Sequence, residues 1–377
     1  MMRHAHDMMA AFDPFALFSM IAAVLIAAAI LTFAACKLLM PLLQRYALAR
    51  PNARSSHKIP TPQGGGIAVL IGLAGTTGFL VAVNIVPFSG AMITLALAAF
   101  GLGILGGWDD IRPLPASLRL AIQGLAVAAV IMTMPLLQLV PWPSPAPLPD
   151  WFLGINFLIL ILAGVWFVNL TNFMDGLDWL SVAGFVPLSA CMALMGALNM
   201  IDTTPALIAA ALCGALLGFA PLNKPVARLF LGDVGSLPIG LIVAWLLYSL
   251  AVSAPLSTPL AINPSKFAGG GLIAALILPL YHLMDATLTL FQRLRRGERV
   301  WQAHRCHAYQ RATDHGFTPL SVAGHVLVLN IMLCALALTC VLSGSMAVNM
   351  LALVMAMVLT LLLIRKFSTP RLAGETS

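Results

Sequence analysis

The sequence predicts an all-α integral membrane protein that crosses the bilayer about eleven times as a single domain covering residues 1–377. Hydrophobic residues make up 60% of the chain, charged residues only 9%, and the mean hydropathy is +0.97. A soluble domain carries roughly a quarter charged residues, so a soluble fold is excluded. Apolar stretches near the ~20 residues that a helix needs to cross a bilayer recur along the whole chain, separated by short polar segments.

The expected spans differ in length. The first follows a segment with one arginine and no cleavage site, so it is expected to be an uncleaved membrane helix rather than a signal peptide. The third and fifth are short and end in polar motifs, which is compatible with tilted helices or with helices that continue through the motif. The spans are residues 14–40, 66–86, 91–107, 117–139, 155–170, 180–199, 205–222, 235–253, 269–291, 319–342 and 346–364.

The cationic residues predict the orientation of the chain. If successive span ends alternate between the two sides, all of the 20 Lys and Arg residues except Arg3 and Lys266 lie on one side. Cytoplasmic loops of membrane proteins carry such an excess. We therefore expect the N-terminus outside and the C-terminus in the cytoplasm. The net charge of +7 then follows from topology and requires no nucleic-acid partner.

Most acidic residues fall on this same side, which the charge rule does not require. Carboxylates next to a membrane cost free energy unless they are paired or bind a metal, so their gathering indicates a functional site. The six cysteines form no CxxC pair, which excludes a disulfide framework and a zinc ribbon. The expected site is built from the cytoplasmic loops 41–66, 107–117, 170–180, 223–235 and 292–318.

A pair of carboxylates, Asp109 and Asp110, directly follows the third span. Adjacent carboxylates repel one another, so they tend to recruit a divalent cation or to share a proton. The alternative is a solvated loop that caps the next helix, with Ser117 as the N-cap residue. The pair by itself supports both interpretations equally.

A regular polar strip ends the fifth span, where Asn169, Asn172, Asp175 and Asp178 follow one another at three-residue intervals. In a helix each of these side chains neighbours the next, so their oxygens converge on one polar cavity. The alternative is a helix end capped by Gly176 in the left-handed conformation, with solvated acids beyond it. The regular spacing favours a functional site.

Asp233 stands between two glycines where another span begins. Small neighbours let a metal-bound phosphate approach such a carboxylate closely. A carboxylate at a helix N-terminus is also stabilised by the helix dipole alone, and this is the favoured interpretation when the motif is taken in isolation.

The longest polar loop contains a compact array of donors that suits a diphosphate, because arginine forms bidentate hydrogen bonds to phosphate oxygens. A topology signal alone is the alternative for its basic residues. A zinc site that includes Cys306 matches no common ligand spacing. The candidate donors are His304, Arg305, His307 and Arg311.

Two weaker signals remain. His57 precedes a rigid turn and three glycines at residues 64–66, which suits a backbone nest for phosphate, with an interfacial turn as the alternative. His282 and Asp285 share one face of the ninth span. A buried, mutually satisfied pair is the favoured interpretation, and support of the site is the alternative.

In this order, the five loop motifs resemble those of the polyprenyl-phosphate N-acetylhexosamine-1-phosphate transferases, bacterial membrane enzymes that start O-antigen and peptidoglycan lipid intermediates. The resemblance covers the chain from Arg54 to Arg311. It implies transfer of HexNAc-1-phosphate from a UDP-N-acetylhexosamine (GlcNAc or a 6-deoxy relative) to undecaprenyl phosphate, with release of UMP. It also implies Mg²⁺ (or Mn²⁺) as cofactor and a bacterial inner membrane location with a periplasmic N-terminus and a cytoplasmic active site. A homodimer is compatible with it.

The resemblance assigns roles residue by residue. It implies catalytic roles for Asp109, Asp110, Asp175 and Asp178, metal binding by Asp110 and Asp233, and substrate binding by Asn169, Asn172, His304, Arg305, His307, Arg311 and His57.

Some positions depart from the family pattern. Trp179 stands where many members have glycine, and Gln63 where many have arginine. The basic loop lacks the run of three histidines of the peptidoglycan branch, so the chain is closer to the branch that starts O-antigen or other surface polysaccharides.

Two other classes were weighed against the transferase. A secondary transporter of a cation or a phosphorylated solute places its ionisable residues near the bilayer midplane, often within inverted repeats. A phosphatidyltransferase of the CDP-alcohol type carries an Asp-Gly-x-x-Ala-Arg signature, which is absent from this chain.

Overall fold

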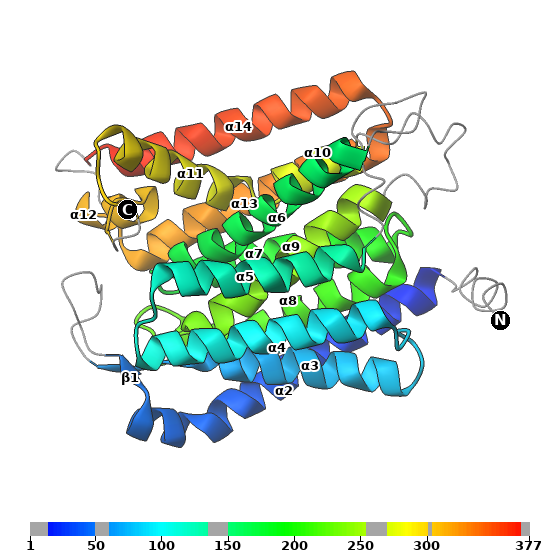
Figure 1. The fold of residues 1–377 in the computed structure, drawn as a ribbon, viewed down its shortest axis with the longest axis horizontal. Coiled ribbons are helices and arrows are strands. Elements are labelled where there is room, and N and C mark those ends of the chain that lie inside the picture. The colour runs from blue at the N-terminus through cyan, green and yellow to red at the C-terminus, as the bar shows by residue number, and fades with distance from the viewer. Residues whose placement is uncertain (1–13, 50–59, 135–149, 254–269, 301–303, 371–377) are drawn as a thin grey trace.

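The computed structural model describes residues 14–49, 60–134, 150–253, 270–300 and 304–370, and in these ranges the chain is almost entirely helical, as predicted. The one sheet pairs β1 (Leu48–Ala49) antiparallel with β2 (Thr61–Pro62). The helices lie side by side in one bundle (Figure 1). They are α2 (Pro14–Tyr46), α3 (Gly65–Ala82), α4 (Gly90–Ile111), α5 (Ala116–Met132), α6 (Asp150–Phe173), α7 (Leu180–Ala197), α8 (Thr203–Asn223), α9 (Asp233–Ser253), α10 (Gly270–Ile277), α11 (Leu280–Arg295), α12 (Ala308–Asp314), α13 (Pro319–Ser343) and α14 (Met346–Ser368).

Among the described residues, nine helices are long and apolar enough to cross a membrane, and the bent pair α10 and α11 would make ten. Each expected span overlaps one of these helices, the bent pair, or the shorter apolar helix α5. Residues 135–139 of the fourth expected span and residue 269 of the ninth lie outside the described residues. The third and fifth spans continue through their polar motifs as α4 and α6. The ninth span is not one straight helix: α10 and α11 differ in direction by 64°. Pro279, which has no backbone N–H to donate, stands at the break.

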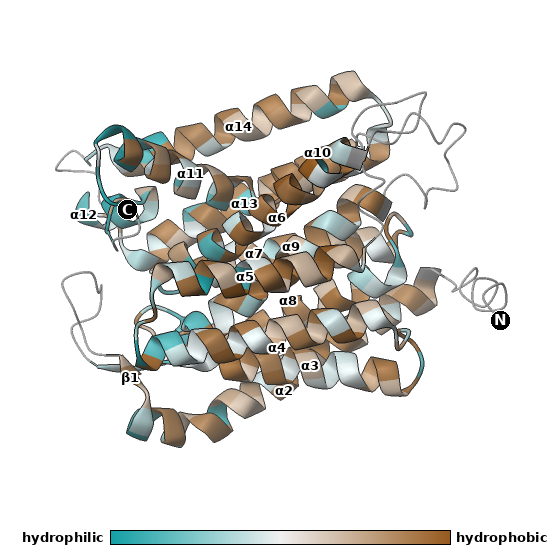
Figure 2. Ribbon diagram, in the orientation of Figure 1, coloured by the Kyte–Doolittle hydropathy of each residue, from teal (hydrophilic) through white to brown (hydrophobic). Residues whose placement is uncertain are grey.

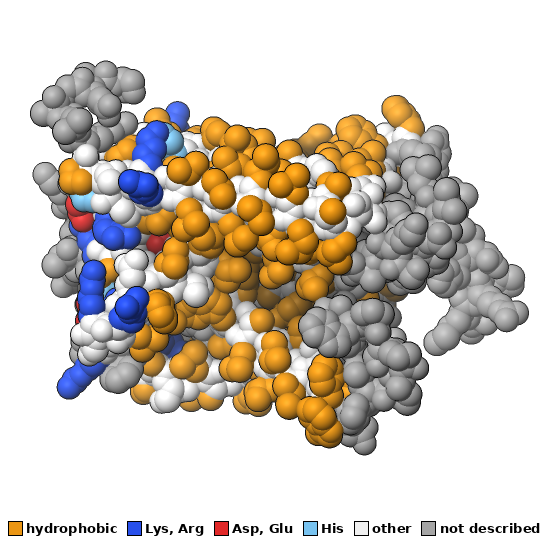
Figure 3. Space-filling view, turned by 90° about the horizontal axis from the view of Figure 1, so that it is seen from above, with side chains coloured by type: hydrophobic (Ala, Val, Ile, Leu, Met, Phe, Trp, Pro, Cys, Tyr) orange, Lys and Arg blue, Asp and Glu red, His pale blue; other side chains and the backbone are white. Residues whose placement is uncertain are grey.

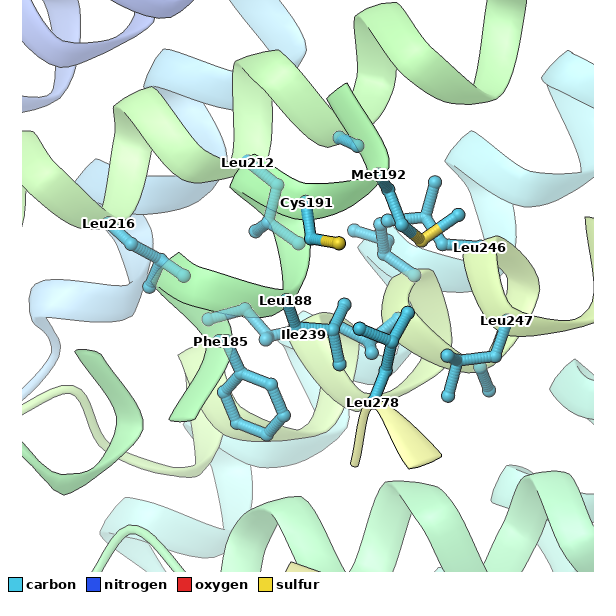
Figure 4. Packing of buried hydrophobic residues seen from close by; sticks show 14 of the residues in the cluster. Phe185, Leu188, Cys191, Met192, Leu212, Leu216, Ile239, Leu246, Leu247 and Leu278 are labelled. Carbon is cyan, nitrogen blue, oxygen red and sulfur yellow. The ribbon is translucent and has the colours of Figure 1, made fainter. Parts of the chain in front are cut away.

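Helices α7, α8 and α9 form the centre of the bundle. Their most apolar windows are 83%, 89% and 94% buried, compared with 17% for α6. Phe185, Leu188 and Met192 of α7 pack against leucines of α8 and α9, including Leu212 and Leu246 (Figure 4). Helices that are apolar on all sides belong inside a bundle, while the outer helices keep an apolar face exposed.

Polar residues gather at one end of this bundle. Figure 2 shows the hydrophilic residues concentrated at the end that carries β1 and α12. On the face seen in Figure 3, the Lys and Arg side chains lie at that same end, and most of the remaining described surface is apolar. The one-sided charge distribution expected from the sequence is therefore a property of the folded bundle.

Glycines bring three helices into backbone contact at the polar end. A Cβ atom at Gly106 of α4 would overlap the backbone of Asp233 at the start of α9. A Cβ atom at Gly66 of α3 would likewise overlap Gly235. Only glycine permits backbones to approach this closely. The first turn of α9 is therefore held directly against α3 and α4.

We predict that Gly106→Ala lowers the free energy of unfolding by about 1–3 kcal/mol, because the added methyl group must displace the Asp233 backbone. Gly101→Ala is the matched control, since nothing lies within 4 Å of a Cβ at that position of the same helix. Alanine favours a helix over glycine, so the control should be as stable as the parent protein or slightly more stable. Thermal unfolding in a single detergent measures both, and equal stability of the two variants would contradict the packing.

Candidate active site

Asp110 joins three sequence motifs at the end of α4. Its carboxylate accepts hydrogen bonds from Gln63 Nε2 at 2.5 Å and from the backbone N–H groups of Asp233 and Val234 at 3.0 and 3.2 Å. The first N–H groups of a helix have no acceptor within the helix and need one from elsewhere. Asp110 provides this acceptor for α9. The carboxylate pair and the glycine-flanked Asp233 therefore lie in one site.

Asn172 connects the polar strip to the same place. From the last turn of α6, its side-chain amide donates to Asp233 Oδ1 at 2.6 Å and to Ser236 Oγ at 3.0 Å. The amide thus orients the Asp233 carboxylate from α6. Helices α4, α6 and α9 each contribute one member of this hydrogen-bonded group.

Asp175, just beyond α6, brings a third carboxylate to the group formed by Asp110 and Asp233. It is half-buried and accepts a hydrogen bond from Ser181 Oγ at 2.6 Å. Burial raises the pKa of this carboxyl group well above its ordinary value, the Ser181 hydrogen bond opposes that shift, and the charges of Asp233 and Asp110 add to it. Carboxylates that repel one another in an enclosed place favour the arrival of a cation.

Asp109 binds different partners from those of Asp110. It accepts a hydrogen bond from the backbone N–H of Leu114 at 2.6 Å and forms a salt bridge with Arg119 at 2.6 Å. The expected N-cap role of Ser117 is wrong, because α5 begins at Ala116 and Ser117 lies in its first turn. Asp109 instead holds the turn that leads into α5.

Two members of the polar strip also serve neighbouring segments. Asp178 is buried and accepts a hydrogen bond from the Ala227 backbone N–H at 2.9 Å, which anchors the loop before α9. Asn169 donates to Gln123 Oε1 on α5 at 2.6 Å. The side chains of the predicted strip therefore contact three different segments of the chain, and they do not all converge on one polar cavity.

Trp179, which replaces a glycine common in the resembling family, has a left-handed backbone with φ 64°. Bulky residues rarely adopt this conformation. It is held by a hydrogen bond from its backbone N–H to Asn223 Oδ1 at 2.8 Å and by one from its indole Nε1 to the Ala220 carbonyl at 2.7 Å. The left-handed residue expected at Gly176 thus occurs at Trp179 instead.

The glycine segment before α3 does not form the expected phosphate nest. The N–H groups of Gly64 and Gly65 donate to the Phe230 carbonyl at 3.2 and 2.8 Å, and that of Gly66 donates to the Leu231 carbonyl at 2.8 Å. These donors are already used between segments of the chain, so they are not free for an anion. His57 lies outside the described residues.

The basic loop lies against the end of the polar strip. Tyr309 of α12 donates its hydroxyl to the Phe173 carbonyl at 2.9 Å, and the His307 ring stacks on the Phe173 ring with centroids 6.2 Å apart. The His304 ring is 4.9 Å from that of His307. The two imidazoles therefore gather where α6 ends and the segment containing Asp175 begins.

The two arginines of the loop differ in their contacts. Arg305 bonds within the loop, to Asp314 Oδ1 and to the Thr313 hydroxyl, both at 3.1 Å. The Nε of Arg311 is buried and has no hydrogen-bond partner among the described residues. In the part of the chain that the structure describes, no three His, Cys, Asp or Glu side chains are grouped to hold a metal ion.

Asp285 does not form the expected pair with His282. Its carboxylate accepts hydrogen bonds from the backbone N–H groups of Ala308 and Tyr309, at 2.8 and 3.4 Å. The Nε2 of His282 is buried without a hydrogen-bond partner, and its ring packs against Phe185. Asp285 therefore belongs with the basic loop.

Several residues that contact the predicted site were not singled out as site residues from the sequence. Gln123 and Ser236 are polar residues buried within apolar helices, which is a signal that sequence inspection can use. The others carry no such signal. The missed residues are Gln63, Arg119, Gln123, Ser181, Ser236 and Tyr309.

The fold and the site are those of a helical membrane protein whose acidic and amide side chains lie beside a basic loop, and the comparisons place this protein among the transferases. Residues 92–251 match the Glycosyl transferase family 4. The chain belongs to the polyprenyl-phosphate N-acetylhexosamine-1-phosphate transferases within it. This membership agrees with the resemblance seen in the motifs and favours the transferase over the transporter and the CDP-alcohol enzyme.

Known relatives match over much of their length. A decaprenyl-phosphate N-acetylglucosaminephosphotransferase of Mycobacterium tuberculosis is 30% identical over 323 residues, which cover 77% of this chain and 74% of the relative. An undecaprenyl-phosphate alpha-N-acetylglucosaminyl 1-phosphate transferase of Escherichia coli is 30% identical over 275 residues, covering 71% and 70%. A phospho-N-acetylmuramoyl-pentapeptide-transferase of Limosilactobacillus fermentum is 32% identical over 240 residues, covering 57% and 70%.

We predict that Asp175→Asn makes the metal-free protein more stable at neutral pH. The folded state raises the pKa of Asp175, so it binds a proton more tightly than the unfolded chain does. Stability from this group is therefore greatest below the unfolded pKa and falls as the pH rises through the folded pKa. Asparagine keeps the acceptor for Ser181 and removes the charge. Thermal unfolding in EDTA across a pH series should show a gain for the variant that grows from acid to neutral pH; a constant difference would contradict the assignment.

Proposed function

We propose that this protein transfers an N-acetylhexosamine 1-phosphate from a UDP-N-acetylhexosamine to undecaprenyl phosphate. An oxygen of the lipid phosphate attacks the β-phosphorus of the UDP-sugar. The bond from that phosphorus to the bridging oxygen breaks, and UMP leaves. The product is a lipid-diphospho-sugar.

The observation that carries this proposal is the hydrogen-bonded group of Asp110, Asp233 and Asn172 beside the basic loop. The Asp110 carboxylate accepts a hydrogen bond from the backbone N–H of Asp233, and the Asn172 amide donates one to the Asp233 carboxylate. His307 stacks on Phe173, the residue that follows Asn172. Negative groups that suit a cation and positive groups that suit a diphosphate thus adjoin, as phosphoryl transfer requires. The names of the relatives describe the same type of reaction.

The donor set fits Mg²⁺. All the donors of the group are oxygens or amides, and Mg²⁺ is commonly held by one or two carboxylates together with waters and substrate phosphates. Asp110 and Asp233 suit that mode, and Asp175 adds a third negative charge beside them. Asp110 and Asp233 would hold the ion, which would neutralise the diphosphate and the departing UMP.

The remaining residues orient the reactants. Arg119, fixed by Asp109 and only part-exposed, offers a positive charge beside the carboxylate group where a lipid phosphate would arrive. His304, His307 and Arg311 face the diphosphate. We assign Asp109 the role of organiser, because its carboxylate binds Leu114 and Arg119 rather than the group formed by Asp110, Asp233 and Asn172. The lipid phosphate is largely ionised at neutral pH and needs no strong base.

The side of the membrane and the pathway belong to this proposal as well. The excess of Lys and Arg on one side supports a cytoplasmic active site, a periplasmic N-terminus and a location in the bacterial inner membrane. The sequence of the basic loop supports a role in starting O-antigen or another surface polysaccharide.

We predict that UMP release from the UDP-sugar requires both polyprenyl phosphate and Mg²⁺, and that EDTA abolishes it. Asp110→Asn and Asp233→Asn should each lower kcat by about 100-fold or more, because each removes a charge from the cation site. Asp202→Asn, at the N-cap of α8 away from the carboxylate group, is the matched control and should keep parental activity. Full turnover of either site variant in Mg²⁺ would refute the assignment.

A panel of UDP-sugars identifies the donor. Membranes that contain the protein are given undecaprenyl phosphate with UDP-GlcNAc or a 6-deoxy relative, and mass spectrometry identifies the lipid product. A lipid-diphospho-sugar with one of these donors supports the proposal. Ion-driven uptake into proteoliposomes without any lipid-linked product would instead support a transporter.

A further inference from the structure

One face of α11 holds both ends of the loop that precedes α12. Asp285, Thr289 and Arg293 follow one another at four-residue intervals, so they share this face, and all three are buried. A charged residue at such a depth is rarely present without partners. Arg293 finds its partners at the start of the loop, and Asp285 finds its partners on its own helix and at the start of α12.

Arg293 binds the beginning of the loop. Its Nε donates to Glu298 Oε2 at 2.8 Å, and its terminal nitrogens donate to the carbonyls of Val300 and Arg299 at 3.2 and 3.0 Å. One guanidinium thus satisfies a carboxylate and two backbone oxygens, a use for which its planar set of donors is suited.

Asp285 binds the end of the loop, where α12 begins. Its Oδ1 accepts from the Ala308 backbone N–H at 2.8 Å and lies 3.6 Å from His307 Nδ1. Its Oδ2 accepts from Tyr309, whose own hydroxyl donates to the Phe173 carbonyl. A single carboxylate therefore binds the backbone on the C-terminal side of His307 and lies close to the imidazole, whose Nδ1 has no hydrogen-bond partner among the described residues. The hydroxyl groups of Tyr281 and Thr289, on the same helix, also donate to this carboxylate.

Tyr309 connects α12 to the segment beside the carboxylate group. A Cβ atom at Gly176 would overlap the Tyr309 hydroxyl, so α12 is packed directly on the segment that follows Asp175. The His307 ring is stacked between Phe173 and Tyr309, with centroid distances of 6.2 and 5.7 Å. Asp285 and the two aromatic rings together define where the imidazole points.

We infer that Asp285 is a positioning residue, which holds His307 and α12 against the carboxylate group so that the imidazole meets the diphosphate of the nucleotide sugar. This inference rests on the function proposed above. It assigns Asp285 no contact with substrate: its carboxylate accepts from the backbone N–H groups of Ala308 and Tyr309 and from two hydroxyl groups of its own helix, and it acts on the substrate through the position of His307.

The test compares donor and acceptor kinetics. Asp285→Ala should raise the KM for the UDP-sugar by about tenfold or more, as the loss of a well-placed charge-assisted contact does, and leave the KM for polyprenyl phosphate within about twofold. Asp285→Asn keeps an acceptor for the Ala308 N–H, so its donor KM should lie between those of the parent and of Asp285→Ala. Asn349→Ala removes a buried polar side chain on α14, bonded to Ser343 at the opposite end of the bundle, and controls for general destabilisation.

A double-mutant cycle separates positioning from simple structural support. If Asp285 acts through His307, the variant that carries both Asp285→Ala and His307→Ala should have the donor KM of His307→Ala alone. Effects that multiply, or an equal rise in the KM for polyprenyl phosphate, would overturn the inference. UMP binding to each folded, monodisperse variant gives a second readout, with weaker binding expected for Asp285→Ala and unchanged binding contradicting the inference. Absence of UMP release from the parent protein would refute the proposed function instead.

Discussion

The site depends on the contact between the end of α4 and the start of α9. A helix that begins at the membrane surface exposes backbone N–H groups that need acceptors, and here the acceptor is the Asp110 carboxylate. The contact is possible because Gly106, one turn earlier, lets the α4 backbone reach that of Asp233. The hydrogen bonds that satisfy the first N–H groups of α9 also bring the carboxylates of Asp110 and Asp233 together. The same contact therefore packs α4 against α9 and assembles the site.

This arrangement has an energetic cost that the function explains. Asp110, Asp233 and Asp175 repel one another in a partly enclosed place, and the raised pKa of Asp175 reflects its burial first and this repulsion second. A fold selected for stability alone would separate these groups or neutralise them. The proposed function accounts for their proximity, because a divalent cation that entered with the diphosphate would meet a preorganised set of negative charges.

The basic loop beside the carboxylate group is held in place by other helices. The basic loop has no long helix of its own, and α12 is too short to hold a fixed position by itself. Its position comes from the α11 face, where Arg293 and Asp285 bind the two ends of the loop, and from Tyr309, which rests on the end of α6. The bend between α10 and α11 gives α11 a direction that differs from that of the span before it. A broken span thus supplies the support for the loop.

The sequence by itself determined the fold class, the apolar spans, the gathering of charge at one end and the family. These follow from local properties: hydropathy over a helix length, the one-sided excess of cations, and motifs whose spacing can be counted. Only the tertiary structure decided which way each polar side chain faces. Asp109 and Asp110 are adjacent in the chain, yet one binds Arg119 and the other binds α9. Asp285 accepts hydrogen bonds from hydroxyl groups of its own helix and also from backbone N–H groups more than twenty positions away, and it does not bond to His282, with which it shares a helix face. Such partners are set by helices that meet through the fold, and spacing along one segment carries no information about them.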